Sequence, residues 1–312
     1  MFKGISFATS ACFIWGLIYV VPQFMQGFSS LEVALGRYLV YGVLSSIVFL
    51  NMRAHGSCRY PLSLWGKALY FSLISTIGFY TLLVTALRYS TPAVCALILG
   101  TSPITIAVYG NWKQKEIPFR SLLFPSILIL IGLAMINIPH LSNGGSLTSY
   151  SLGLVCSLLS LSAWTWYVVT NSRFLKQYPN MHSTHWCTMI GIATLFWVMI
   201  FALVLLLFFE NQIHFEKYRA LDADLVGFLV GSAVLGVFSS WLAEFLWNRA
   251  SFHLPVALAG QLTILEAAFA VLFVFILEQR WPPAIECAGM SLQLAAIIYG
   301  IHLFVKKEKL AL

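Results

Sequence analysis

Ten long apolar runs constrain this chain more than any other feature of its sequence. A helix needs about 20 apolar residues to cross the hydrocarbon of a bilayer, and each run is close to that length. The runs are continuously apolar, whereas the strands of a membrane barrel alternate apolar and polar residues. The sequence therefore predicts an all-α membrane protein with ten transmembrane helices. They cover residues 4–21, 31–50, 64–87, 93–111, 121–138, 152–171, 184–209, 225–247, 255–277 and 284–305.

The composition points to the same class of protein. Hydrophobic residues make up 60% of the chain and charged residues 9%, and the mean hydropathy is +0.85. A soluble domain carries about 25% charged residues, so this chain has too few to cover a surface that faces water. The net charge of +7 would indicate a nucleic-acid partner in a soluble protein. Here the basic residues lie between apolar runs, which makes them topology determinants and lipid headgroup contacts, with no nucleic acid expected.

The basic residues also predict the orientation. With the N-terminus in the cytoplasm, thirteen Lys and Arg residues fall on the cytoplasmic side and five on the outer side. This bias follows the positive-inside rule and agrees with an even number of spans. Both termini are therefore expected in the cytoplasm. The first run lacks a small-residue cleavage site and is about membrane length, so we interpret it as a first span and not a removed signal peptide.

Signatures of cofactors, metals and enzymes are missing from the sequence. The six cysteines are scattered without CxxC spacing and are expected to be small buried hydrophobes. No phosphate-binding glycine loop with lysine, no GxSxG and no HExxH occurs. His182 and His185 have a spacing that can hold a metal, but no further ligands are evident nearby, so an interfacial pair is expected. We therefore expect no ATPase, no cofactor and no metal.

The two halves of the chain show a weak internal repeat. Superimposing Pro92 on Pro255, an offset of 163, places the third and fourth runs on the eighth and ninth. Gly132 and Gly289 then lie at similar depth in the following runs. We predict two five-helix repeats, 1–145 and 146–312. Because five is odd, the second copy enters the membrane from the opposite side, an arrangement that generates alternating access.

Several motifs resemble those of a known family. They are WG at 15–16, ALGRY at 34–38, ALRYSTPAVCALILGTSPI at 86–104, and the glutamates Glu116 and Glu278 that close the fourth run of each repeat. The chain resembles the EamA-type ten-helix permeases of the drug/metabolite transporter superfamily over essentially its whole length. The resemblance implies a secondary transporter of small metabolites in the bacterial plasma membrane, without a cofactor.

This chain departs from the family pattern at two places. The family often has Asn soon after the WG motif, whereas Leu17, Ile18 and Tyr19 follow it here. Glu266 stands where the second repeat usually has proline, the position that Pro103 occupies in the first repeat. The resemblance therefore supports the fold better than it supports a particular substrate.

Two carboxylates inside apolar runs are the strongest candidates for a site. Glu266 lies near the middle of the ninth run and Glu244 within the eighth, where an ionisable residue is costly and marks a functional hypothesis. Either can bind an amino group or carry a proton, or can be a structural hydrogen-bonded group. Trp241, Glu244 and Asn248 fall at i, i+3 and i+7, on one helical face.

Other candidates surround these carboxylates. Arg37 can bind a substrate carboxylate, pair with a buried acid or reach the outer headgroups. Gln261 is a further polar candidate, one turn before Glu266. The aromatic candidates for lining a cavity, which can equally be packing residues, are Trp15, Tyr80, Trp164 and Tyr167.

The function predicted from the sequence is export of amino acids, aromatic or related, by alternating access, with proton coupling as a further expectation. The alternatives are efflux of drugs or other cationic compounds, a membrane enzyme acting on lipid-linked substrates, and a passive channel or scaffold. The expected partners are the lipid bilayer, a small-molecule substrate and protons. The chain is expected to be a monomer or a weak dimer.

Overall fold

The chain folds into helices throughout the part that the structure describes. The computed structural model describes residues 1–312 apart from 26, 56–59, 90–94, 96–97, 116, 138–146, 209–217, 219–221, 280–282 and 311–312, and these described residues contain no strand. The helices are α1 Phe2–Trp15, η1 Gly16–Tyr19, η2 Val21–Phe24, α2 Ser30–Ala54, α3 Leu62–Ser72, η3 Leu73–Gly78, α4 Phe79–Tyr89, α6 Ser102–Gln114, α7 Phe119–Asn137, α8 Leu147–Gln177, α9 Ser183–Phe208, α10 Ala223–Val234, η7 Leu235–Leu242, α11 Ala243–His253, α12 Val256–Leu262, α13 Ile264–Glu278 and α14 Ala284–Leu310.

Most of the predicted spans correspond to long apolar helices. Seven stretches of the described residues are long and apolar enough to cross a membrane. Shorter apolar helices occupy Phe119–Met135 and Cys287–Leu303, within the fifth and tenth predicted spans. The second part of the fourth predicted span is α6, and much of its first part lies outside the described residues. The all-helical membrane fold is therefore confirmed, whereas the number of ten spans stays a prediction.

Four of the spans are not regular α-helices. The first span continues after α1 as the two 3₁₀ segments η1 and η2. The third and eighth spans each contain a π-helical segment, η3 and η7. The ninth span breaks at Thr263, between α12 and α13. Short 3₁₀ and π segments inside helices often mark hinges or functional sites, so these four positions are candidates for a functional site.

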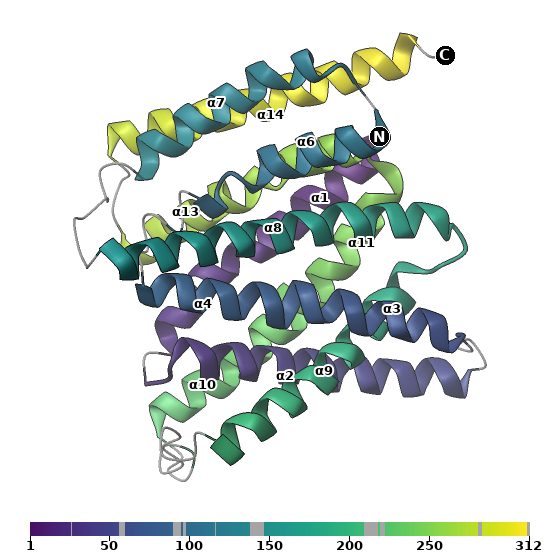
Figure 1. The fold of residues 1–312 in the computed structure, drawn as a ribbon, viewed down its shortest axis with the longest axis vertical. Coiled ribbons are helices and arrows are strands. Elements are labelled where there is room, and N and C mark those ends of the chain that lie inside the picture. The colour runs from purple at the N-terminus through teal and green to yellow at the C-terminus, as the bar shows by residue number, and fades with distance from the viewer. Residues whose placement is uncertain are drawn as a thin grey trace.

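The helices pack in pairs that lie far apart in the sequence (Figure 1). α7 packs on α14, α2 on α9, α6 on α12, α4 on α8, and α1 on α11. The α7–α14 pair approaches closely because Gly132 lies against the backbone carbonyl oxygen of Gly289. Small residues at such contacts let two helix backbones come together where lipid supplies no hydrophobic driving force.

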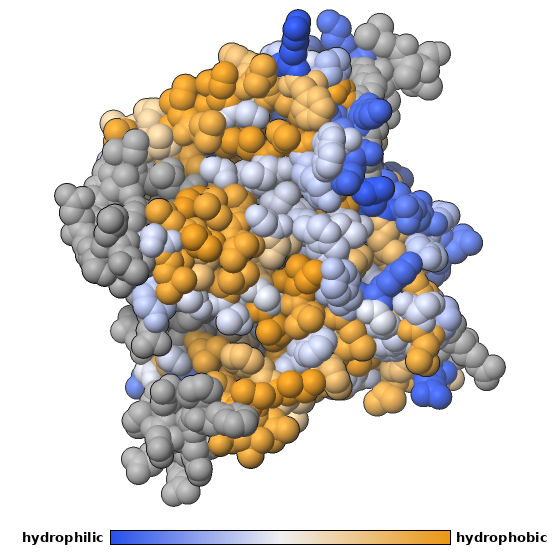
Figure 2. Space-filling view, viewed as in Figure 1, coloured by the Kyte–Doolittle hydropathy of each residue, from blue (hydrophilic) through white to orange (hydrophobic). Residues whose placement is uncertain are grey.

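The surface has the distribution that a bilayer requires. Figure 2 shows apolar residues over most of the visible face, and hydrophilic residues gathered along the edge where α1 begins and α14 ends in Figure 1. Many large apolar side chains are exposed, among them Leu62, Leu123, Leu207 and Ile298. Four of the cysteines, Cys12, Cys95, Cys156 and Cys187, are buried as predicted. The prediction was wrong for Cys287, which is exposed near the start of α14, and Cys58 lies outside the described residues.

Candidate functional site

Two of the helix breaks meet at Glu266. Glu266 lies in the first turn of α13, directly after the break at Thr263. Tyr19 is the last residue of η1, in the broken part of the first span. The Tyr19 hydroxyl donates a hydrogen bond of 3.3 Å to Glu266 Oε1. Tyr19 remains 52% exposed and Glu266 is half-buried, so neighbouring side chains do not fully cover this pair.

A second set of contacts is centred on the π-helical segment η7. Arg37 of α2 donates from Nε to Ser240 Oγ at 2.8 Å and from Nη2 to the Ser239 carbonyl oxygen at 3.2 Å. Trp15 Nε1 donates to the same Ser239 oxygen at 3.1 Å. The first and second spans are thus both held by one turn of the eighth. The guanidinium of Arg37 lies within the bundle and does not extend away to the headgroups.

Glu244 forms the third part of the arrangement, at the start of α11. Its Oε1 accepts a hydrogen bond of 2.5 Å from the hydroxyl of Tyr167, which is 2% exposed. One turn further along the same two helices, Asn171 Nδ2 donates to Asn248 Oδ1 at 2.9 Å. Glu244 and Asn248 therefore share the face of α11 that meets α8, as residues four apart on a helix do.

The predicted aromatic residues form a connected set of rings. The ring centroids are 6.3 Å apart for Trp15 and Trp164, 5.8 Å for Trp164 and Tyr167, and 5.3 Å for Trp15 and Trp247. Tyr80 packs edge-on against Tyr38 at 6.3 Å, and the Tyr38 ring in turn lies 5.2 Å from the guanidinium of Arg37. These rings give the interior of the bundle large, stiff apolar surfaces next to the Arg37 guanidinium and the Tyr167–Glu244 pair.

Two predicted residues have other surroundings. The Trp241 ring stacks on Phe245 with centroids 6.0 Å apart, and its buried Nε1 has no hydrogen-bond partner in the structure. Gln261 is 2% exposed and its Oε1 lies against Gly300 of α14, at the contact between α12 and α14. The structure therefore links Arg37, Trp15, Trp164, Tyr167 and Glu244 through a chain of contacts. Glu266 forms a separate pair with Tyr19, and Gln261 lies at a separate helix contact.

Sequence reasoning missed several partners. Ser239 and Ser240 hold Arg37 and Trp15, and Asn171 joins Asn248 to Trp186, whose Nε1 donates to Asn171 Oδ1 at 2.7 Å. The sequence feature that could have indicated these partners is the presence of polar residues, the Ser239–Ser240 pair and Asn171, inside apolar runs. Which helix each would meet depends on the packing, which the sequence does not display.

The charges of the site are unequal in number. The Arg37 guanidinium acts electrostatically on both Glu244 and Glu266. Arg37 is thus a single cation for two carboxyl groups, so the three side chains together carry a net negative charge whenever both carboxyl groups are ionised. Buried net charge is costly in a low dielectric.

No metal centre is apparent in the part of the chain that the structure describes, where no three His, Cys, Asp or Glu side chains are grouped to hold an ion. His182 and His185 lie close, with ring centroids 5.2 Å apart. Glu116 and the side chain of Glu278, both singled out in the sequence, fall outside the described part.

Glu32, near the start of α2, has a structural role. It forms a capping box with Ser29, and its Oε1 accepts a hydrogen bond of 2.9 Å from the Tyr218 hydroxyl. Partial burial, and then the hydrogen bond and charge of the Glu32 carboxylate, raise the pKa of Tyr218 above its usual value. This contact ties the connection after α9 to the beginning of α2.

Comparison with known proteins gives consistent results. Residues 2–138 match the EamA-like transporter family. The chain is 29% identical over 318 residues to the inner membrane protein YtfF of Escherichia coli (strain K12), covering 99% of this chain and 97% of that protein. It is 26% identical over 185 residues to the uncharacterized transporter YyaM of Bacillus subtilis (strain 168), covering 57% and 54%. One solved crystal structure superposes with a TM-score of 0.76 over 96% of this chain and 98% of the other, at 15% identity, which supports the fold.

Proposed function

We propose that this chain, whose residues 2–138 match the EamA-like transporter family, belongs to that family and exports amino acids or closely related small solutes across the bacterial inner membrane. One relative is named as an inner membrane protein and another as a transporter. The apolar helices make this chain a multi-pass membrane protein. Export and the amino-acid substrate rest on the family resemblance and on the chemistry of the site.

The observation that carries the proposal is the Tyr19–Glu266 pair, whose carboxyl group is within electrostatic range of Arg37. An amino acid presents an ammonium group and a carboxylate, and the site offers Glu266 for the first and the Arg37 guanidinium for the second. Tyr19 is half exposed, so a solute can reach Glu266. The neighbouring rings of Trp15, Trp164 and Tyr80 favour an aromatic side chain over a small polar one.

Glu244 supports a role for protons in the same cycle. It is bonded to the buried Tyr167, whereas Glu266 is bonded to the exposed Tyr19. We assign substrate binding to Glu266 and propose that the cluster exchanges one proton for one substrate ammonium. A proton on either carboxyl group balances the single positive charge of Arg37 when the substrate has left.

Several features support alternating access by two inverted repeats, 1–145 and 146–312. The π-helical segments η3 and η7 occupy equivalent places in the third and eighth spans. Lys115 and Gln279, which end α6 and α13, both have a φ of 52°. If each helix is replaced by its equivalent in the other repeat, the α4–α8 pair becomes the α11–α1 pair, and both pairs are in contact. The α2–α9 and α7–α14 pairs each join two equivalent helices.

The proposed orientation places both termini in the cytoplasm. Thirteen of the eighteen Lys and Arg residues then fall on that side. The start of α1 and the end of α14 lie at one edge of the molecule, where hydrophilic residues gather in Figure 2. Since the residues of the site all belong to one chain, a monomer or a weak dimer suffices for this mechanism.

A flux assay in proteoliposomes tests the proposal. We expect saturable transport of phenylalanine that is accelerated by a pH gradient. Glu266→Gln removes the charge that holds the ammonium and is expected to lower transport at least about tenfold, the loss of one charge-assisted hydrogen bond. The matched control is Asp224→Asn, which removes an exposed carboxylate at the start of α10 and is expected to leave transport unchanged. Proton coupling would be refuted if Glu266→Gln transports normally and the flux through the wild-type protein does not depend on the pH gradient.

Efflux of cationic compounds is the second candidate, because two carboxyl groups face a single guanidinium. The same proteoliposomes distinguish the two functions. A lipophilic cation that has no carboxylate would be transported independently of Arg37, so Arg37→Gln would leave its flux intact. An amino acid requires both Arg37 and Glu266, and its flux would fall in both variants.

A further inference from the structure

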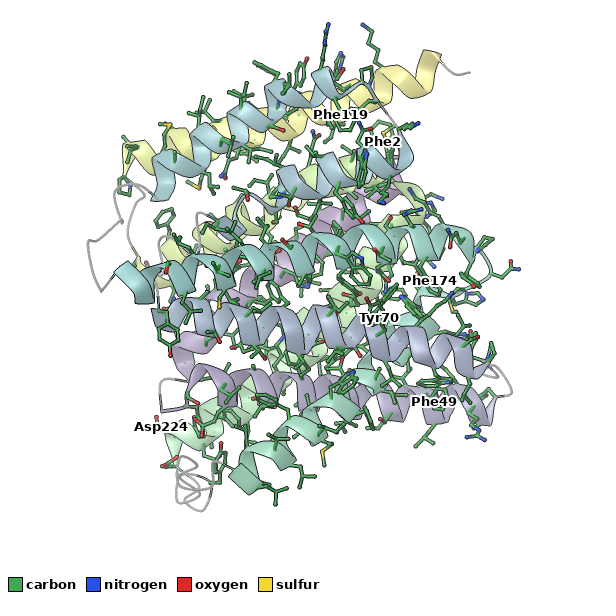
Figure 3. All side chains as sticks on the ribbon, viewed as in Figure 1. Phe2, Phe49, Tyr70, Phe119, Phe174 and Asp224 are labelled. Atoms are coloured by element: carbon green, nitrogen blue, oxygen red, sulfur yellow. The ribbon has the colours of Figure 1, made fainter. Side chains whose placement is uncertain are left out.

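A cleft lies outside the proposed transport site, next to Phe174, which Figure 3 labels on the side of the molecule where hydrophilic residues gather in Figure 2. It has a volume of about 260 Å³. Its walls come from the start of α3 and from the turn between α8 and α9, which belong to different halves of the chain. The lining residues are Tyr60, Leu64, Gln177, Tyr178, Pro179, Asn180 and Met181. The turn is held by a backbone hydrogen bond of 2.9 Å from Met181 to Tyr178, so this wall is preformed.

Lys67 supplies a cation at the cleft. Its Nζ donates a hydrogen bond of 3.1 Å to the Tyr178 hydroxyl and lies 4.9 Å from the Tyr178 ring centroid and 5.1 Å from that of Phe174. The rings hold the ammonium in place, and two of its three hydrogens remain for another acceptor. On the other wall, the Tyr60 hydroxyl is hydrogen-bonded to His185 Nδ1, which orients both groups.

The segments around the cleft contain no acidic residue. Residues 51–70 and 171–187 carry five Lys and Arg residues and three histidines, and neither segment contains Asp or Glu. The positive charge on this edge is therefore not balanced by carboxylates of the same two segments. The cleft is complementary to an anion.

The apolar surroundings indicate which anion. Leu64 and Met181 form an apolar base to the cleft and are 7% and 6% exposed. Leu62, at the start of α3, is 89% exposed beside it. A small free ion gains no binding free energy from apolar side chains. An amphiphile, in contrast, places its acyl chains along the helices and its phosphate among the polar groups. Basic pockets between transmembrane helices at the cytoplasmic surface bind phospholipid head groups in this way.

We propose that this cleft binds the phosphate of an anionic phospholipid, with Lys67 as its principal cation and the hydroxyl of Tyr178 and the amide of Asn180 as further polar contacts. Because one wall belongs to α3 and the other to the α8–α9 turn, the bound lipid holds two distant segments together. This site is independent of the transport site at Glu266.

Thermal unfolding of the purified full-length protein in mild detergent tests the proposal. Short-chain phosphatidylglycerol is titrated beside short-chain phosphatidylcholine, which has the same phosphate but no net charge. We expect a saturable rise in the unfolding midpoint with phosphatidylglycerol and little change with phosphatidylcholine. Lys67→Gln is expected to raise the half-saturating concentration about fivefold, the effect of one basic residue near a lipid head group. Lys67→Arg is expected to keep the wild-type value.

Lys113→Gln is the matched control. Lys113 is also predicted on the cytoplasmic side. Its ring partners, Tyr109 and Trp112, do not line the cleft, whereas Lys67 contacts the lining residue Tyr178. Its loss is expected to change the half-saturating concentration less than twofold. If Lys67→Gln fails to fold, Asn180→Trp fills the cleft without removing a charge and is expected to abolish the saturable shift.

Three results would overturn the assignment. Equal stabilisation by the two lipids would show an apolar groove without charge selection. Equal effects of Lys67→Gln and Lys113→Gln would show general surface attraction. An equal shift with inorganic phosphate at the same concentration would assign the cleft to free phosphate.

Discussion

Tyr19 and Glu266 are hydrogen-bonded across 247 positions of the chain, from the broken first span to the start of α13. Tyr19 is the last residue of the 3₁₀ segment η1, and Glu266 lies in the first turn of α13, just after the break at Thr263. Both side chains therefore belong to places where a span departs from regular α-helix, and their hydrogen bond is a polar contact between the two halves of the chain.

The first prediction concerns the contribution of Tyr19. Tyr19→Phe removes the hydroxyl that bonds to Glu266 and leaves the ring in place. We expect the apparent KM for the transported amino acid to change about threefold to tenfold. This is the effect of losing one hydrogen bond to a charged group when the substrate can partly take the place of the lost hydroxyl. Proteoliposome flux measures this change. Tyr299→Phe, on α14 beside Phe124, is the control and is expected to transport normally. An unaltered KM in Tyr19→Phe would mean that the pair is not part of the site.

The second prediction concerns how Arg37 is held. Its guanidinium bonds to Ser240 Oγ and to the Ser239 carbonyl at the same time, which an ammonium group cannot reproduce. Arg37→Lys is expected to destabilise the protein by about 1–3 kcal/mol, and Ser240→Ala by about 1 kcal/mol because only one bond is lost. Thermal unfolding in detergent gives the order of the midpoints. An Arg37→Lys variant as stable as the wild type would show that the fork geometry is unimportant.

The third prediction concerns the buried amides of α8 and α11. Asn248→Ala leaves Asn171 Nδ2 without its partner, and an unsatisfied buried donor costs about 1–3 kcal/mol. Asn171→Ala removes in addition the acceptor of Trp186 Nε1, so it is expected to cost more. A double-mutant cycle checks the coupling between the two positions. Additive effects would mean that the two amides do not act on each other in the membrane.

The fourth prediction concerns the contact between α7 and α14. A methyl group on Gly132 would lie 2.5 Å from the carbonyl oxygen of Gly289, and backbone cannot move aside as a flexible side chain can. Gly132→Ala is expected to destabilise the protein by about 1–3 kcal/mol through overpacking. Gly66→Ala is the control, because a methyl group there meets no atom within 4 Å. It is expected to be neutral or slightly stabilising, since alanine favours the helix. Equal unfolding midpoints for the two variants would contradict the close contact.

The positions of the helices could be predicted from the sequence because burial in lipid depends on local composition. The second and seventh predicted spans, 31–50 and 184–209, correspond to α2 Ser30–Ala54 and α9 Ser183–Phe208 with small shifts at the ends. Polar residues inside such runs were also recognisable, since an ionisable group in hydrocarbon is rare and costly. This is why Glu266, Glu244 and Arg37 stand out in the sequence alone.

The partners of those residues could not be predicted in the same way. The repeat suggested that Gly132 and Gly289 occupy equivalent depths, but only the structure places one against the backbone of the other. Ser239 is an ordinary serine in an apolar run, and its carbonyl oxygen, in the π-helical segment η7, accepts hydrogen bonds from Trp15 and Arg37. The periodicity of the apolar residues does not indicate that change in helix type.

The sequence by itself determined that this chain is a helical membrane protein and which polar groups are too costly to be incidental. Lipid imposes that outcome locally, because every run of about 20 apolar residues must satisfy its own backbone hydrogen bonds. The tertiary structure decided which of these groups meet. Contacts such as Tyr19 with Glu266 and Tyr167 with Glu244 depend on the helix breaks and on the packing of distant helices, and no local property of the chain encodes them.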